Sequence, residues 1–171
     1  MTEYIYHTGS IQEIIPDHGP LDTVLCFSQT PYYVHYTGEQ KIYRFMPKKD
    51  FINANMLFID PDNRTEEVMS LVSEFAAKHR IDAELAESLI DESENVFRLA
   101  EKDEEDGEDN LPPGVDEYMV AFESQMYAAK IAKRLGYEGA VGTDEQGPVF
   151  LVDMLGREDE LEDVTGVEID Y

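Results

Sequence analysis

Hydrophobic residues follow two different periods along the chain. In the first third and towards the C-terminal end they form short runs or alternate with polar residues, which is typical of β-strands. We therefore expect strands at residues 3–7, 23–28, 41–46, 56–59, 139–142 and 148–154. In the middle they recur every three or four positions, and this spacing predicts helices at residues 65–80, 82–91 and 116–135.

Turn and capping residues separate these elements. Thr30 followed by Pro31 is typical of a helix start, so we expect a short helix after Pro31 that stops at Gly38. Gly136 is expected to end the third long helix, and residues 143–147 (TDEQG) predict the turn of a hairpin. The order of strands and helices predicts an α+β domain.

The most polar stretch covers residues 101–109 (EKDEEDGED), which hold seven acids, one Lys and one Gly. Such a block is typical of a solvated loop, and we expect an acidic loop over about 101–114. The alternative is a surface that mimics phosphates and faces a nucleic-acid-binding protein. The segment after Gly156 is also acidic.

Charge narrows the possible functions. The chain has 171 residues, a length typical of one domain, with 38 acidic and 13 basic side chains and a formal net charge of -25. Nucleic-acid phosphates should repel such a chain, so we expect no direct nucleic-acid binding. A hydrophobic content of 42% is enough for a core. The charge remains compatible with docking onto a basic partner, or with solubility alone.

Cys26 is the single cysteine, which excludes an internal disulfide and a cysteine-rich zinc site. No apolar run approaches the roughly 20 residues that span a bilayer, and no basic N-terminal segment precedes an apolar one. The four histidines lack metal-binding spacing, so we expect no metal. We expect a cytoplasmic protein without membrane contact.

Two short clusters have residues suited to chemistry. In Tyr6–Ser10 (YHTGS) a predicted strand ends in a polar turn, where a His and the backbone beside a Gly can hold ligand hydroxyls and a carboxamide. In Asp144–Gly147 (DEQG) carboxylates lie at a hairpin tip. Both clusters are equally compatible with ordinary turns, because Asp and Gly are common in them.

Taken in order, these segments carry a resemblance to a known family. The blocks are Tyr6–Ser10, Phe122-Glu123-Ser124-Gln125, Arg134–Tyr137 (RLGY) and Asp144–Gly147. The chain resembles the ADP-ribosyltransferase-type anti-CRISPR family directed against type I-F systems. The separation between the Leu-Gly-Tyr and Asp-Glu-x-Gly blocks also matches, whereas residues 101–110 and the tail lie outside the resemblance.

The resemblance implies a fold and an activity. The fold would be one domain over residues 1–171, with two small packed antiparallel β-sheets, surrounding helices, an NAD cleft between the sheets and a helical insertion at about 65–95. The activity would be mono-ADP-ribosylation with NAD+ as substrate. The target would be the PAM-reading subunit of a type I CRISPR surveillance complex, in the cytoplasm of the bacterial host, and modification would block DNA recognition.

The same resemblance implies the acid of the site. Cleavage of the nicotinamide–ribose bond develops an oxocarbenium-like cation, which a fixed carboxylate stabilises. Asp144 is the matching acid, and Glu145 is its rival for the role.

The remaining implied residues would hold NAD+. His7 would bond the nicotinamide-side ribose, and the backbone at Thr8 and Gly9 would hold the carboxamide. Either Tyr32 or Tyr33, after the Phe27–Ser28 strand end, would stack on the nicotinamide. The remaining candidates are Glu123, which could equally support the strands, and, from the scarcity of cations, Arg44 and the pair Lys48–Lys49 for the diphosphate.

Two other functions stay open. One is a non-catalytic acidic inhibitor that occupies a DNA-binding surface by charge mimicry and needs neither NAD+ nor Asp144. The other is an NAD-consuming toxin of the same fold.

Overall fold

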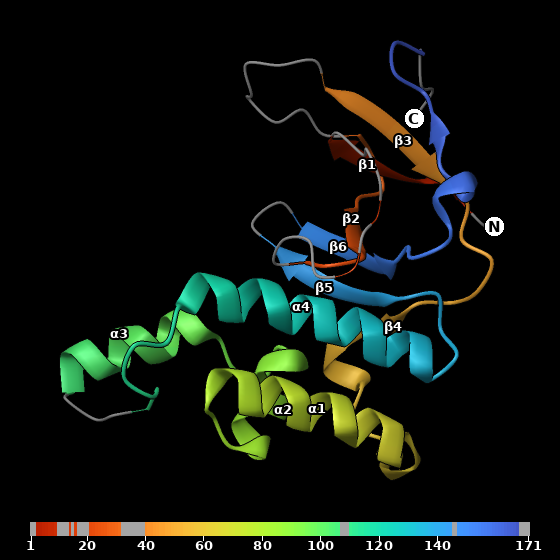
Figure 1. Cartoon of the computed structure of the whole chain (residues 1–171). Coiled ribbons are helices and arrows are strands. Elements are labelled where there is room, and N and C mark those ends of the chain that lie inside the picture. Colours follow the sequence, from red (N-terminus) through yellow and green to blue (C-terminus); the bar gives the residue numbers. More distant parts are fainter. Residues whose placement is uncertain are drawn as a thin grey trace.

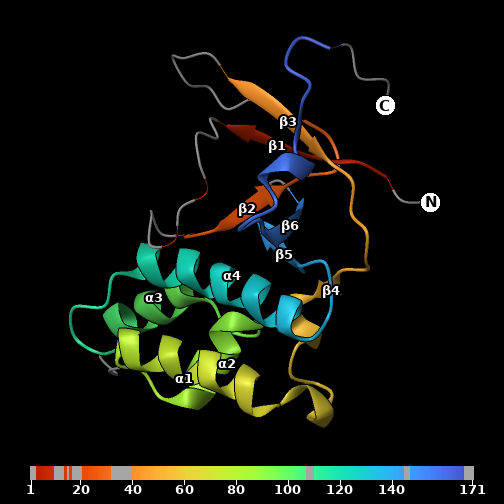
Figure 2. The same cartoon turned by 45° about the vertical axis from the view of Figure 1, so that its right-hand side comes forward.

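Helices and strands form three layers in the computed structural model, which describes residues 3–9, 14, 16, 21–31, 40–106, 110–144 and 147–167. Figures 1 and 2 show the helices on one side of a central sheet and a smaller sheet on the other. The strands are β1 (Ile5–Gly9), β2 (Val24–Phe27), β3 (Lys41–Phe45), β4 (Ile52–Asn53), β5 (Ala140–Asp144), β6 (Gly147–Asp153) and β7 (Glu162–Asp163). The helices are α1 (Glu66–His79), α2 (Ala83–Ile90), α3 (Val96–Asp106) and α4 (Glu117–Arg134).

The two sheets meet at one point. The outer sheet has the strand order β1-β3-β7, and the central sheet has the order β2-β6-β5-β4. An antiparallel bridge between Tyr6 and Ser28 joins β1 to the end of β2, with backbone hydrogen bonds of 2.8 and 2.9 Å. Strand β1, which contains the predicted ligand-binding residues, therefore lies where the two sheets meet.

Two hydrophobic cores hold the layers together. The larger one lies between the helices and the central sheet, where α4 packs on β5 and β6 while α1 and α2 pack on α4. The smaller core lies between the sheets and contains Ile5, Phe27, Phe45, Val152 and Met154. Each face of the central sheet is thus buried, which explains why β2 and β6 are largely apolar on both sides.

The expected helix ends are confirmed by their caps. Thr65, Asp82 and Asp116 accept hydrogen bonds from backbone N–H groups of the first turns of α1, α2 and α4. Gly136, with φ of 92°, follows the end of α4 as expected. No helix of the described residues is both long and apolar enough to cross a membrane.

The expected strand at residues 56–59 is wrong. Leu57 and Phe58 are buried whereas Met56 and Ile59 are exposed, so the apolar residues do not alternate. A 3-10 turn (Ala54–Met56) occupies this region instead, and the strand comes earlier, as β4. Leu57 and Phe58 therefore pack on the core from a turn and not from a strand.

Two further expectations need correction. The central sheet is mixed rather than antiparallel, because β4 pairs with β5 in parallel and the helices make the crossover between them.

The acidic block begins inside α3, which runs to Asp106. The first six residues of the block are therefore helical and do not form a loop. Buried Val96 and Leu99 anchor that helix, and it continues into the acids. The helix expected after Pro31 lies outside the described residues.

Candidate functional site

His7 lies on β1 beside β2, and its ring is fixed by one hydrogen bond. Its Nδ1 is 2.8 Å from the carbonyl oxygen of Cys26. A carbonyl can only accept, so Nδ1 donates the proton. Burial lowers the pKa of His7, and the bond to Cys26 only partly opposes this, so the ring is neutral at pH 7. Its Nε2 is consequently left as a hydrogen-bond acceptor, which suits a ligand hydroxyl.

Gly9 keeps that acceptor accessible. A Cβ atom at position 9 would lie 2.9 Å from His7 Nε2, which is closer than real side chains approach. Thr8, between them, is only 6% exposed, and its hydroxyl has no hydrogen-bond partner within the described part of the chain. An unpaired buried hydroxyl is unusual and is typical of functional regions. His7 Nε2 and the Thr8 hydroxyl therefore have no hydrogen-bond partner among the described residues, and strand alternation places them on opposite faces of β1.

Phe27 and Ser28, which the resemblance also placed near NAD+, lie beside β1. Phe27 is fully buried, and its ring meets the His7 ring edge-on at a centroid distance of 5.8 Å. Ser28 forms the bridge to Tyr6 that joins the sheets. Phe27 thus orients the imidazole from the core, and its ring is packed rather than open to a ligand.

Acidification below about pH 6.5 should destabilise the protein through His7. The fold lowers the pKa of His7, so the unfolded chain takes up the proton first. This contribution to stability is complete above the ordinary His pKa and is lost as pH falls towards the lower folded value. Urea unfolding at several pH values should show a shallower decline for His7→Gln than for the wild type. Equal slopes would contradict the assignment of a neutral buried ring.

A cavity of about 460 Å³ opens between the two sheets near this junction. Its wall includes Ile5, two residues before His7 on the same face of β1, and the rings of Phe51 and Phe150. It also includes Lys48 and Lys49, the pair considered for a diphosphate. Lys49 has no ion pair with any residue that the structure describes. The cavity therefore has lysine side chains beside aromatic surface, and Glu3 and Asp50 line it as well.

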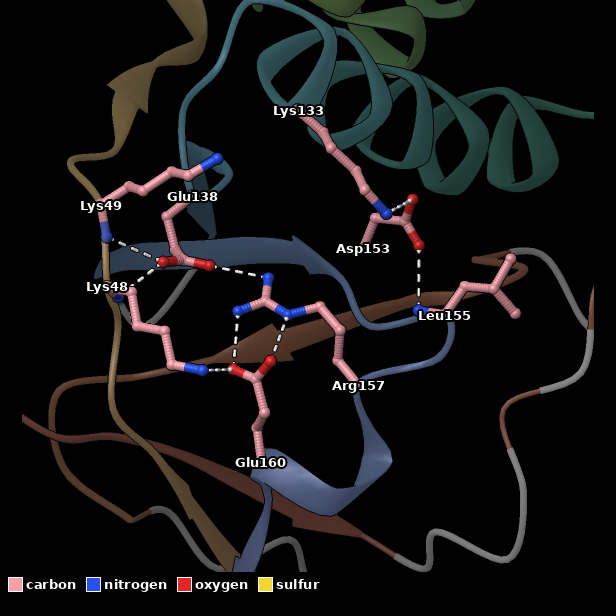
Figure 3. A network of polar contacts seen from close by, with 8 residues as sticks. All are labelled: Lys48, Lys49, Lys133, Glu138, Asp153, Leu155, Arg157 and Glu160. Carbon is pink, nitrogen blue, oxygen red and sulfur yellow. Dashed lines mark hydrogen bonds and ion pairs between the residues drawn. The ribbon is translucent and has the colours of Figure 1, made fainter.

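A buried carboxylate holds the lysine segment in place (Figure 3). Glu138, 4% exposed, accepts hydrogen bonds from the backbone N–H groups of Lys48 at 2.6 Å and Lys49 at 2.9 Å. Its second oxygen lies 2.7 Å from Arg157. Arg157 also binds Glu160 through two nitrogens, which lowers the pKa of Glu160 to about 2, and Glu160 pairs with the Lys48 ammonium at 3.0 Å. This network makes the cavity wall rigid.

The sequence did not single out Glu138. Nothing distinguishes it among 38 acids except its place between Gly136 and Gly139, at the entry to a strand. Burial and three partners, which only the fold reveals, give it its role.

Arg44 and Glu123 are not brought to His7. Arg44 makes a two-pronged ion pair with Glu162, with distances of 2.7 and 2.8 Å, and its guanidinium stacks 4.4 Å from the Tyr4 ring centroid. Arg44 is paired with Tyr6 in the register, so strand alternation places it on the opposite face of the outer sheet from His7.

Glu123 lies in the helical layer. It is buried on α4 and bonds His79 of α1 at 2.8 Å and Lys78 at 3.0 Å. The central sheet separates this cluster from His7 (Figure 2). These contacts support the packing of α1 on α4.

The predicted acid lies at the end of β5. Asp144 pairs with Gly147, and the structure describes its backbone only. Phe150 of β6 pairs with Phe27 on one side and with Val141 of β5 on the other. Asp144 lies three residues after Val141, so it is two strands across and three residues along the sheet from Phe27. Standard sheet spacings put the two Cα atoms about 14 Å apart on a flat sheet. Glu145, Tyr32 and Tyr33 lie outside the described residues.

Glu92, which no sequence pattern singled out, reaches the same end of β5 from the loop after α2. Its carboxylate accepts from the Thr143 N–H at 3.3 Å and occupies the space that a side chain at Gly142 would fill. Burial is the main cause that raises its pKa, and its φ of 61° is rare for a residue other than Gly. Glu92 thus ties the start of α3 to the strand that carries Asp144.

Comparisons with known proteins show a likeness at the level of structure. No protein-family model matches the chain, and no curated protein matches it. The chain is similar to a solved structure described as a crystal structure of an anti-CRISPR protein, with a TM-score of 0.48 and 21% sequence identity. The match covers 89% of this chain and 90% of that one.

Proposed function

We propose that the chain is an NAD+-dependent mono-ADP-ribosyltransferase that modifies a protein of the type I CRISPR surveillance complex and blocks its recognition of the PAM. The observation that carries the proposal is the arrangement at residues 7–9. The neutral His7 has an Nε2 that no described residue hydrogen-bonds, and Gly9 leaves space beside that atom at the junction of two sheets. This arrangement fits a sugar hydroxyl, which can donate to a neutral imidazole nitrogen.

In the proposed reaction His7 Nε2 accepts a hydrogen bond from a hydroxyl of the nicotinamide ribose. The bond between the nicotinamide nitrogen and the ribose carbon breaks, and nicotinamide leaves with the bonding electron pair. The carbon becomes cationic, and the Asp144 carboxylate stabilises that charge. A nucleophile of the acceptor protein then bonds to this carbon and loses its proton, so one ADP-ribose is transferred.

The cavity supplies a place for the anionic half of NAD+. The diphosphate would pair with Lys49, which makes no ion pair with a described residue, while Glu138 and Arg157 hold the segment. A rigid wall lowers the entropic cost of binding. Bound NAD+ would then extend from His7 along β1, past Ile5, to Lys49.

The net charge of -25 supports a protein target whose surface is basic. A surface that normally contacts DNA has this property. Electrostatic attraction would raise the association rate with such a surface and would weaken with added salt.

Gly9→Ala should reduce NAD+ affinity by about tenfold or more, because the added methyl group obstructs the His7 acceptor and one ligand hydrogen bond is lost. Calorimetric titration of the purified protein with NAD+ measures the effect. Tyr6→Phe is the matched control on the same strand, since the Tyr6 side chain lies on the opposite face of β1 from His7. NAD+ affinity equal to the wild type in Gly9→Ala would contradict the assigned ribose site.

Labelled NAD+ separates the proposed function from the two alternatives. Nicotinamide release that depends on the surveillance complex supports transfer. Rapid release without the complex would favour an NAD-consuming toxin. Inhibition of DNA binding with no NAD+ present would favour an acidic inhibitor.

A further inference from the structure

Helices α3 and α4 share an exposed aromatic surface. Its members are Phe97 on α3 and Tyr118, Met119 and Phe122 on α4, and Tyr118 is 68% exposed. The Phe97 and Tyr118 rings meet edge-on at 5.1 Å, and Phe122 follows Tyr118 by one helical turn. We call this set the α3–α4 patch. The Phe97 and Tyr118 rings therefore contact each other without a partner.

Acidic residues surround the patch. Glu101 lies one turn after Phe97, and α3 as a whole contains five acids against two cations. Asp116 caps α4, and Glu117 opens it. The block of acids at 101–109, for which the proposed reaction gives no role, thus begins on the helix that carries Phe97.

The loop before α3 is tied to the end of β5. Glu92, five residues before Phe97, bonds the Thr143 N–H, and Asp144 follows in the chain. The loop that leads into α3 is therefore fixed to the strand that carries the proposed catalytic acid.

We propose that the α3–α4 patch docks the acceptor protein through a basic surface with an apolar centre. Aromatic anchors with a charged rim are the usual composition of an energetic interface. A second copy of this chain is disfavoured, because each copy carries -25 charges, and anionic lipid is disfavoured for the same reason. The inference rests on the proposed function, since it assigns the surface that holds the acceptor.

The test measures binding of the full chain to purified type I-F surveillance complex by surface plasmon resonance. Tyr118→Ser with Phe122→Ser should weaken binding by about 100-fold, mainly through faster dissociation, because two central aromatic anchors are lost. Neutralising Glu101 and the acids at 103–106 as Gln and Asn should slow association and flatten its dependence on salt. The matched control is Met56→Ser with Ile59→Ser, where Ile59 is 64% exposed on a remote turn, and its binding should equal the wild type.

Three outcomes would overturn the docking surface. These are wild-type affinity in the aromatic variant, an equal loss in the control, and no binding by the wild-type chain. The affinity for NAD+ in calorimetric titration serves as a separate readout and should stay unchanged in the aromatic variant. Binding with no NAD+ turnover would refute the proposed function and leave the docking surface standing.

Discussion

Replacing Asp144 with Ala should lower the rate of ADP-ribose transfer by about 10²–10³-fold, the effect of removing one preorganised electrostatic group from a reacting centre. The affinity for NAD+ should change little, because the carboxylate acts on charge that develops only as the glycosidic bond breaks. Single-turnover transfer and NAD+ titration measure the two quantities separately.

Glu145→Gln distinguishes Asp144 from its neighbour. If Asp144 is the catalytic acid, Glu145→Gln retains most of the transfer rate, whereas Asp144→Asn loses it as Asp144→Ala does. The reverse ranking would transfer the role to Glu145. Equal activity in all three variants would show that neither carboxylate reacts.

Glu138→Ala should lower the free energy of unfolding by about 3–5 kcal/mol, the range for breaking a buried ion pair. Its removal leaves the Arg157 guanidinium without its buried partner and leaves the N–H groups of Lys48 and Lys49 without an acceptor. Urea unfolding followed by circular dichroism measures the loss.

Glu162→Ala is the control for this change. Its pair with Arg44 is exposed, so its removal should alter stability little. If both variants unfold at the same urea concentration, the network at Glu138 does not fix the cavity wall. Glu138→Gln should fall between, because it keeps an oxygen for the N–H groups but loses the charge.

Local signals predicted α1, α2, α4 and most strands, but not α3, where a loop was expected from residue 101. Thr65, Asp82 and Asp116 act as helix caps in the structure because a side-chain oxygen before an amphipathic run satisfies free N–H groups whatever the fold. The contact of the His7 ring with Phe27 and the bridge from Tyr6 to Ser28 were not predicted, because they depend on how β1 meets β2.

Features set by long-range packing could not be predicted. The parallel pairing of β4 with β5 depends on a crossover of more than eighty residues, and no local pattern records it. Arg44 was favoured because cations are scarce, but strand alternation turns it towards Glu162. Glu138 and Glu92 acquire their roles only when distant segments meet.

Mass spectrometry of the surveillance complex after incubation with NAD+ is the most direct test of ADP-ribose transfer. If transfer occurs as proposed, the PAM-reading subunit gains the mass of one ADP-ribose with wild-type protein and gains none with Asp144→Ala. Loss of DNA binding then follows the adduct. An unmodified subunit in a complex that has nevertheless lost DNA binding would contradict the proposed transfer.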